Sequence, residues 1–229
     1  TGAPHQVTVK REPGTASSTV HRAPACALMP GNIGYVNGKM TSYTSAVSLR
    51  DSLGAARAMV LDLRGCSMAT LPPALQWLLP AGATFAKEAH MVPDVPGAFE
   101  LKEPTITGKG QGNGYKGQVV ILTDAGTQGA AEYLAIAMQS IAGVTVMGAS
   151  TAGTAGTPSA ITLPGGVNTA ISGTSVYYTD GTTTQGTGVR INTVLAPTVA
   201  GIVAGNDDLL EAAIQWLNKA NSSGATGKR

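Results

Sequence analysis

The stretch QVVILTDAGTQGAAEYLAIAMQSIAGVTVMGASTAGTAG, residues 118–156, decides the fold. Its first apolar run predicts a buried strand over Val119–Thr123, and it ends in a loop rich in glycine and threonine, Gly148–Gly156. Between these two segments the pattern predicts a turn, a helix and a second strand, over Asp124–Gly126, Ala130–Ile141 and Val144–Met147. A strand, a helix and a strand in this order are typical of a parallel α/β sheet.

A second strand–helix–strand unit lies earlier in the chain. A strand is predicted over Asn32–Asn37, a helix over Thr41–Leu53 and a continuous apolar strand over Ala58–Leu63. Two parallel strands need a crossover connection, and the intervening helix supplies it. The repeated pattern indicates an α/β fold.

The remaining segments give weaker signals. A helix is predicted over Leu71–Leu79, with two prolines in its first turn, where they are tolerated. The segment Phe85–Gly117 is rich in proline and glycine and is expected to follow the surface without regular structure. Strands are expected at His5–Arg11, Thr19–Arg22, Val167–Tyr178 and Thr182–Val189, with a turn at Asp180-Gly181, and a closing helix at Asp207–Leu217, capped by Asn206 or Asp207.

Composition limits the class of protein. Hydrophobic residues make up 43% of the 229 residues, which is ample for a core, whereas charged residues make up only 12%, about half the usual share. The net charge of +2 is too small to favour a nucleic-acid partner. No apolar run approaches the roughly 20 residues of a membrane span. The low charge and the many small residues favour a periplasmic or secreted protein. The absence of a signal peptide and of an initiator Met predicts a mature or trimmed chain.

The two cysteines, Cys26 and Cys66, are too few for a metal site, and no cofactor is expected. Two arrangements of these thiols are open. They could form a disulfide, or they could be two separate buried thiols, which the sequence favours.

Five pieces of sequence together give a family resemblance: IGYVNGKM, LDLRGCSMAT, LTDAGTQGAAEYLA, GASTAGTAG, and QGTGVRINTVLAPT followed by GNDDLLEAAIQWL. In this order and spacing, the chain resembles the C-terminal processing peptidases, or tail-specific proteases, which are serine peptidases. The resemblance implies a ClpP/crotonase-like α/β fold over residues 31–217. It also implies that residues 1–30 contain strands from the end of a PDZ domain that is otherwise absent, and that residues 218–229 form a flexible tail.

The resemblance assigns the nucleophile position to Gly129. The family reads Ser-Ala-Ser-Glu where this chain reads Gly129-Ala130-Ala131-Glu132, and glycine has no side chain that could attack a carbonyl. The helix that follows would still favour developing negative charge at its N-terminus. We expect Glu132 to be structural, capping this helix, so that Glu132→Gln costs at most ~1 kcal/mol. The rival interpretation makes it an acid of the site.

The base and its orienting acid are also replaced. In one branch of the family a lysine follows the serine by about 25 residues, and Thr154 stands at that position. In the other branch a glutamate orients a histidine, and Gln185 stands at the glutamate position. A hydroxyl without a nearby base is not a general base. The three histidines, His5, His21 and His90, match no family motif and are expected on the surface or in strands.

The oxyanion donors of the family are backbone N–H groups from a Gly-Gly turn and from the residue after the serine. Here Met68 and Ala69 replace the glycines, while Ala130 keeps the second donor. Two substitute nucleophiles are open, Cys66 on the turn expected to face the site and Thr127 two residues before Gly129, but neither has a visible base, and Cys66 is expected to be structural.

Several functions remain open on this evidence. The first is a serine-peptidase-family domain that binds a peptide or an unfolded protein segment but is catalytically disabled; its oligomeric state is not predicted. The others are a carrier of an apolar small ligand on the same fold, an engineered Ser-to-Gly mutant of an active peptidase, and an assembly role. This chain differs from the family at the nucleophile, the base, the orienting acid and the oxyanion turn together. Natural loss of catalysis is therefore favoured over an engineered mutation.

Overall fold

The protein is described here from a computed structural model, in which residues 26–40, 46–68, 75, 77–79, 82, 84–92, 94–95, 97–103 and 114–224 are placed well enough to describe. Its strands are β1 (Cys26–Met29), β2 (Ile33–Asn37), β3 (Ala58–Asp62), β4 (Ser67–Met68), β5 (Ala86–Met91), β6 (Phe99–Lys102), β7 (Gln118–Thr123), β8 (Gln128–Gly129), β9 (Val144–Gly148), β10 (Pro158–Leu163), β11 (Val167–Ser172), β12 (Thr174–Tyr178) and β13 (Thr193–Val194). Its helices are the 3₁₀ turn η1 (Gly38–Met40), α1 (Ala46–Leu53), α3 (Ala130–Gln139), α4 (Val199–Ala204) and α5 (Asp208–Gly224).

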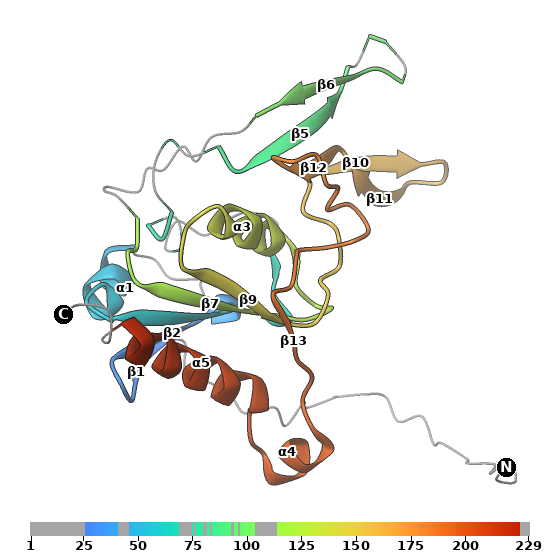
Figure 1. The fold of residues 1–229 in the computed structure, drawn as a ribbon. Coiled ribbons are helices and arrows are strands. Elements are labelled where there is room, and N and C mark those ends of the chain that lie inside the picture. Colours follow the sequence, from blue (N-terminus) through green and yellow to red (C-terminus); the bar gives the residue numbers. More distant parts are fainter. Residues whose placement is uncertain are drawn as a thin grey trace, which may run out of the picture.

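A six-stranded sheet in the order β1-β2-β3-β7-β9-β13 forms the centre of the protein. Strands β2, β3, β7, β9 and β13 run parallel, and β1 is an antiparallel edge strand. Helices α1 and α3 lie on one side of this sheet and α5 lies on the other (Figure 1). The predicted α/β class and both predicted strand–helix–strand units are therefore confirmed.

Each side of the sheet has its own apolar core. On β3, Met59 and Leu61 belong to the core that α3 covers, and Val60 belongs to the core beneath α5, where it joins Leu209 and Leu217. Successive side chains of a strand point to opposite faces, so a strand covered on both sides reads as a continuous apolar run. This explains why Ala58–Asp62 and Val119–Thr123 are buried along their whole length.

Two smaller β layers lie beyond α3. One is a three-stranded antiparallel sheet in the order β12-β5-β6, and the other is the hairpin β10–β11 (Figure 1). The expectation that residues 85–117 lack regular structure is therefore wrong for β5 and β6. Apolar and polar residues alternate in β6, and the prolines and glycine that suggested a loop fall between the two strands in the sequence, at 93, 96 and 97.

Other predicted boundaries also need correction. The single strand predicted over 167–178 is divided at Gly173 into β11 and β12, which belong to different sheets; a Cβ on Gly173 would collide with the side chain of Ser159. No strand forms over 182–189, where the chain makes turns and one isolated bridge to β12. Strands β10 and β13 and helix α4 were not predicted.

The two ends of the predicted domain also differ from the structure. Strand β1, which we assigned to the N-terminal segment 1–30, pairs with β2 in the main sheet, and α5 continues to Gly224 instead of ending at Leu217. The predicted strands at 5–11 and 19–22, and most of the predicted helix at 71–79, lie outside the described residues. The division of the chain into segment, domain and tail stays a prediction.

An ion-pair network fastens α5 to the central sheet. The Arg64 guanidinium donates to the carboxylates of Asp62, at 2.6 and 2.9 Å, and of Asp207, at 2.6 and 2.8 Å. Tyr35 donates its hydroxyl to Asp62 at 2.8 Å. Asp207 also accepts the backbone N–H of Leu210 at 3.0 Å, so Asp207, not Asn206, caps α5.

We predict that Asp207→Asn lowers the free energy of unfolding by about 1–3 kcal/mol at neutral pH, because it removes a charged partner of Arg64. Burial alone would raise the pKa of Asp207, but hydrogen bonds from Arg64 and from Leu210 outweigh it and lower that pKa. The stabilisation is therefore complete above the ordinary carboxyl pKa of ~3.9 and is lost as pH falls through the lowered value. Urea denaturation between pH 7 and pH 2 should show a shallower acid slope for the variant. Asp51→Asn, in an exposed ion pair, is the control, and equal acid slopes for wild type and Asp207→Asn would contradict the prediction.

Candidate functional site

The candidate site lies at the carboxyl ends of β3 and β7, where two turns meet. Asp124, after β7, accepts the backbone N–H of Gly65 at 2.6 Å and that of Gly126 at 2.9 Å. The carboxyl ends of neighbouring parallel strands are the usual position of ligand sites in α/β sheets. Asp124 thereby joins the turn that contains the predicted oxyanion residues to the turn that leads to Gly129.

Gly129 occupies a sharp strand-to-helix turn. It ends β8, which pairs with β4 so that Met68 lies opposite Gly129, and it is the N-cap of α3 with φ 62° and ψ −125°. Non-glycine residues rarely adopt this backbone conformation. A Cβ built on Gly129 would lie 2.5 Å from the carbonyl oxygen of Met68. The local backbone is thus compatible with glycine and crowded for any residue with a side chain.

The Glu132 carboxylate is fully buried and accepts several hydrogen bonds. Its donors are the backbone N–H groups of Gly153 (2.7 Å), Thr154 (2.7 Å) and Gly129 (3.3 Å), and the hydroxyls of Thr151 and Thr154, the latter at 3.0 Å. These bonds hold the loop after β9 against the first turn of α3. The expected structural role of Glu132 as a cap agrees with this geometry, and the number of partners exceeds what a cap alone requires.

Thr154, at the base position, is close to Gly129. Its Oγ1 accepts the Gly129 N–H at 3.3 Å and donates to Glu132 at 3.0 Å. The structure therefore brings together the two positions that the sequence assigned to nucleophile and base. Because the Thr154 hydroxyl is hydrogen-bonded to a carboxylate and a backbone amide, its contribution here is to hold the loop in place.

Gln185, at the orienting-acid position, is directed elsewhere. Its Nε2 donates to the Ser172 hydroxyl at 2.8 Å, and its buried Oε1 has no hydrogen-bond partner. Its backbone neighbour Gly186 does reach the site loop, donating to the Gly153 carbonyl at 2.9 Å. The predicted segment thus lies beside the site, but the Gln185 side chain contacts β11 and makes no hydrogen bond to Gly129 or Thr154.

The oxyanion positions are only partly preserved. Met68 directs its carbonyl oxygen, an acceptor, toward the place of a side chain at 129, whereas an oxyanion hole requires donors there. Ala69 lies outside the described residues. Ala130 is the first residue of α3, so its N–H is one of the four that a helix N-terminus leaves without an intrahelical acceptor.

The substitute nucleophiles both have structural roles. Cys66 is buried, and burial together with the nearby Asp62 raises the pKa of its thiol to about 12, which disfavours the reactive thiolate. Thr127 is fully buried and donates its hydroxyl to the Leu63 carbonyl at 2.8 Å. The two thiols are separate, as expected, but only Cys66 is buried, whereas Cys26 is half-buried.

A polar cluster next to α3 was not predicted from the sequence. Tyr133 of α3 donates its hydroxyl to Glu88 at 2.6 Å, and His90 lies 2.9 Å from the other oxygen of Glu88. Burial and the neighbouring Glu88 raise the pKa of Tyr133. The cluster links β5 to α3, and His90 is half-buried within a strand, as expected. His5 and His21 lie outside the described residues.

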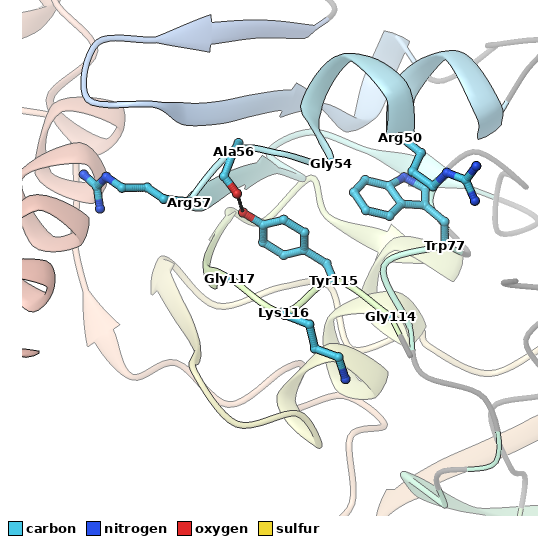
Figure 2. Close-up of a pocket in the computed structure, with 9 residues that line it drawn as sticks. All are labelled: Arg50, Gly54, Ala56, Arg57, Trp77, Gly114, Tyr115, Lys116 and Gly117. Carbon is cyan, nitrogen blue, oxygen red and sulfur yellow. Dashed lines mark hydrogen bonds between the residues drawn. The ribbon is translucent and has the colours of Figure 1, made fainter. Parts of the chain in front are cut away.

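A surface hollow of about 450 Å³ lies at the other end of the sheet, near the start of β3 and β7. Figure 2 shows that its cations, Arg50, Arg57 and Lys116, point in different directions. Arg57 donates to the carbonyls of Gly31 and Leu217 and to Asn218, so its guanidinium is already engaged. The hollow is remote from Gly129 and is not built as an anion site.

Comparison with known proteins identifies the family of this chain. The sequence matches peptidase family S41 over residues 32–195. The chain therefore belongs to this family, and the predicted relationship to serine peptidases is confirmed. No curated protein sequence matches the chain.

Solved structures share the fold. A protein of Parabacteroides merdae named as a peptidase is 22% identical, with a TM-score of 0.72 over 84% of this chain and 63% of that one. A lipoprotein from Streptococcus agalactiae is 16% identical (TM-score 0.63, 85% and 68%), and a photosystem II D1 C-terminal processing protease is 20% identical (TM-score 0.53, 76% and 46%). At these identities the likeness shows the fold alone. The chain spans less than two thirds of the first of these proteins.

Two further observations concern only the described part of the chain. None of its helices is long and apolar enough to cross a membrane. It contains no cluster of three or more histidine, cysteine, aspartate or glutamate side chains that could hold a metal ion.

We predict that Gly129→Ala lowers the free energy of unfolding by about 2–4 kcal/mol. The backbone conformation at φ 62° accounts for about 1–3 kcal/mol, and the contact with the Met68 carbonyl adds to it. Urea denaturation measures the change. Gly165→Ala is the control, because Gly165 also has a positive φ (89°) but open space around it; it should cost about 1–2 kcal/mol. Equal costs would show that the Met68 contact is unimportant.

We also predict that Glu132→Gln costs about 2–4 kcal/mol, more than the sequence alone suggests. The amide keeps the shape but presents an NH₂ group to backbone N–H donors that are buried with it, and losing a charged acceptor costs more than losing a neutral one. Thermal and urea melts measure the change, with Glu211→Gln on the exposed side of α5 as the control. A cost below ~1 kcal/mol would mean that the loop does not depend on this carboxylate.

Proposed function

We propose that this chain is an S41-family domain that binds a peptide or an unfolded protein segment without hydrolysing it. The observation on which the proposal rests is Gly129, a residue without a reactive atom in the strand-to-helix turn where the family resemblance expects the serine. We extend the proposal to a periplasmic or secreted location, on the basis of the low proportion of charged residues.

The surroundings of Gly129 support the absence of catalysis. Acyl transfer needs a nucleophile, a base to take its proton, and donors for the oxyanion. Thr154 is hydrogen-bonded to Glu132, and Gln185 is hydrogen-bonded to Ser172, so neither is arranged as a base or as its orienting group. A reactive serine would therefore lack its partners even if it were restored.

We favour natural loss over an engineered inactivation, because an engineered change would replace one group and leave its partners in place. The departures at Met68, Thr154 and Gln185 therefore support natural loss.

Peptide binding is supported by the β layers that follow the site loop. The hairpin β10–β11 begins directly after this loop, and no other described strand pairs with its two edges, to which an extended peptide could add by backbone hydrogen bonds. Leu163, Val167 and Ile171 are exposed on it, and residues 151–179 contain no charged side chain. These features favour an extended, uncharged and partly apolar segment as the ligand.

The test measures binding and hydrolysis in the same preparation. We expect fluorescein-labelled, reduced casein to bind, seen as increased fluorescence anisotropy, and to remain intact on gels. A fluorophosphonate probe should label neither the wild type nor Gly129→Ser, because the base and the oxyanion turn, each worth ~10²–10⁴ in rate, are altered as well. Circular dichroism confirms that the variant is folded.

A matched pair of variants locates the binding. Thr154→Trp adds bulk beside Gly129 and should weaken casein binding, whereas Val203→Trp adds bulk to the exposed surface of α4, across the sheet, and should not. Stoichiometric labelling of the wild type, or casein cleavage restored by Gly129→Ser, would overturn the catalytic part of the proposal. Absence of casein binding would overturn the peptide part.

A further inference from the structure

Within the described part of the chain, strand β6 is an edge without a further partner strand in the sheet β12-β5-β6, which projects from the body of the protein beyond α3 (Figure 1). Its residues Phe99 and Leu101 are 63% and 66% exposed, as is Met91 of β5 at 62%. An exposed edge with apolar side chains is a template for pairing with another strand. This edge lies outside the Gly129 site, so a role for it does not depend on the proposed function.

The register identifies which backbone groups of β6 face outward. Glu100 lies opposite His90 and Leu101 opposite Ala89, and Val92 donates to the Ala98 carbonyl at 3.0 Å. Because hydrogen-bonded pairs alternate in an antiparallel ladder, the amide groups of Glu100 and Lys102 face β5. Those of Phe99, Leu101 and Glu103 therefore face the open edge.

The charges on β6 alternate with its apolar residues. Glu100 and Lys102 lie on one face, with their charged groups 3.4 Å apart and both side chains more than half exposed. Phe99 and Leu101 lie on the other face, with Ala89 and Met91 of β5. The strand thus has one charged face with both signs and one apolar face.

We propose that β6 pairs antiparallel with β6 of a second copy of this chain, with the two-fold axis at Leu101. In this register Leu101 lies opposite its own copy, and each Glu100 lies opposite the partner's Lys102. If the two-fold axis moved by one residue, to Glu100 or to Lys102, that residue would lie opposite its own copy. Like charges directly opposite one another are destabilising. Parallel pairing in register has the same fault. Charge complementarity therefore favours β6 of a second copy as the partner strand, and it favours this register.

The same pairing also brings the exposed apolar side chains of the two copies into contact. Diagonal neighbours in an antiparallel pair are within reach of aromatic side chains, so Phe99 of each copy meets Leu101 of the other. The two arms become one continuous sheet with the order β12-β5-β6-β6-β5-β12, in which the outward amide groups of Phe99, Leu101 and Glu103 find partners. The interface is isologous, as two-fold dimers require.

A charge swap tests the proposal. Light scattering coupled to size-exclusion chromatography, over a hundredfold range of concentration, should show the wild type in a monomer–dimer equilibrium. Glu100→Lys and Lys102→Glu should each raise the dimer dissociation constant at least ~10-fold, because each places like charges opposite one another. The double variant Glu100→Lys/Lys102→Glu restores opposite charges and should restore the dimer.

Cross-linking tests the register. Leu101→Cys should form a disulfide-linked dimer on mild oxidation, since paired Cα atoms lie ~5.5 Å apart, within the range that a disulfide spans. Phe99→Cys, which faces Glu103 of the second copy, should not, and the wild type controls for Cys26 and Cys66. A wild type that is monomeric at all concentrations, or a double variant that fails to recover the dimer, would overturn the proposal.

Discussion

The buried carboxylate of Glu132 is the constraint on which the site depends. A charge taken fully out of water must be matched by hydrogen bonds, and Glu132 obtains them from the loop at 151–154 and from the N–H of Gly129. Its position in the first turn of α3 adds the favourable field of the helix N-terminus. The conformation of the loop, the start of the helix and the position of Thr154 are therefore fixed by one side chain.

Gly129 has no side chain and adopts a sharp strand-to-helix turn of the kind that presents a nucleophile in α/β-hydrolases. Such a backbone costs free energy for any residue with a Cβ, and glycine avoids that cost. The close approach of the Met68 carbonyl oxygen would add to the cost for a residue with a side chain. Membership of the family thus defines the fold, while the function must be argued from the site.

The sequence predicted the central layers because their patterns are strong. The apolar runs of β3 and β7 and the spacing of α3 indicate their structure without tertiary information. Strands β5 and β6 were missed, since the prolines and glycine between them dominate the local signal. The proximity of Thr154 to Gly129 came from the resemblance alone. The full set of Glu132 donors and the bond from Tyr133 to Glu88 depend on contacts 19 to 45 positions apart, which no local pattern encodes.

The acidic side chains near the site already have hydrogen-bond partners within the fold. Asp62 and Asp207 neutralise Arg64, which joins the sheet to α5, and Asp124 accepts two backbone N–H groups at the junction of the turns. Glu132 is engaged by the loop, and Glu88 by Tyr133 and His90. A carboxylate that orients a base must be free to hold that base near the nucleophile. In a chain with only 12% charged residues, these carboxylates near the site are already engaged in holding the fold together.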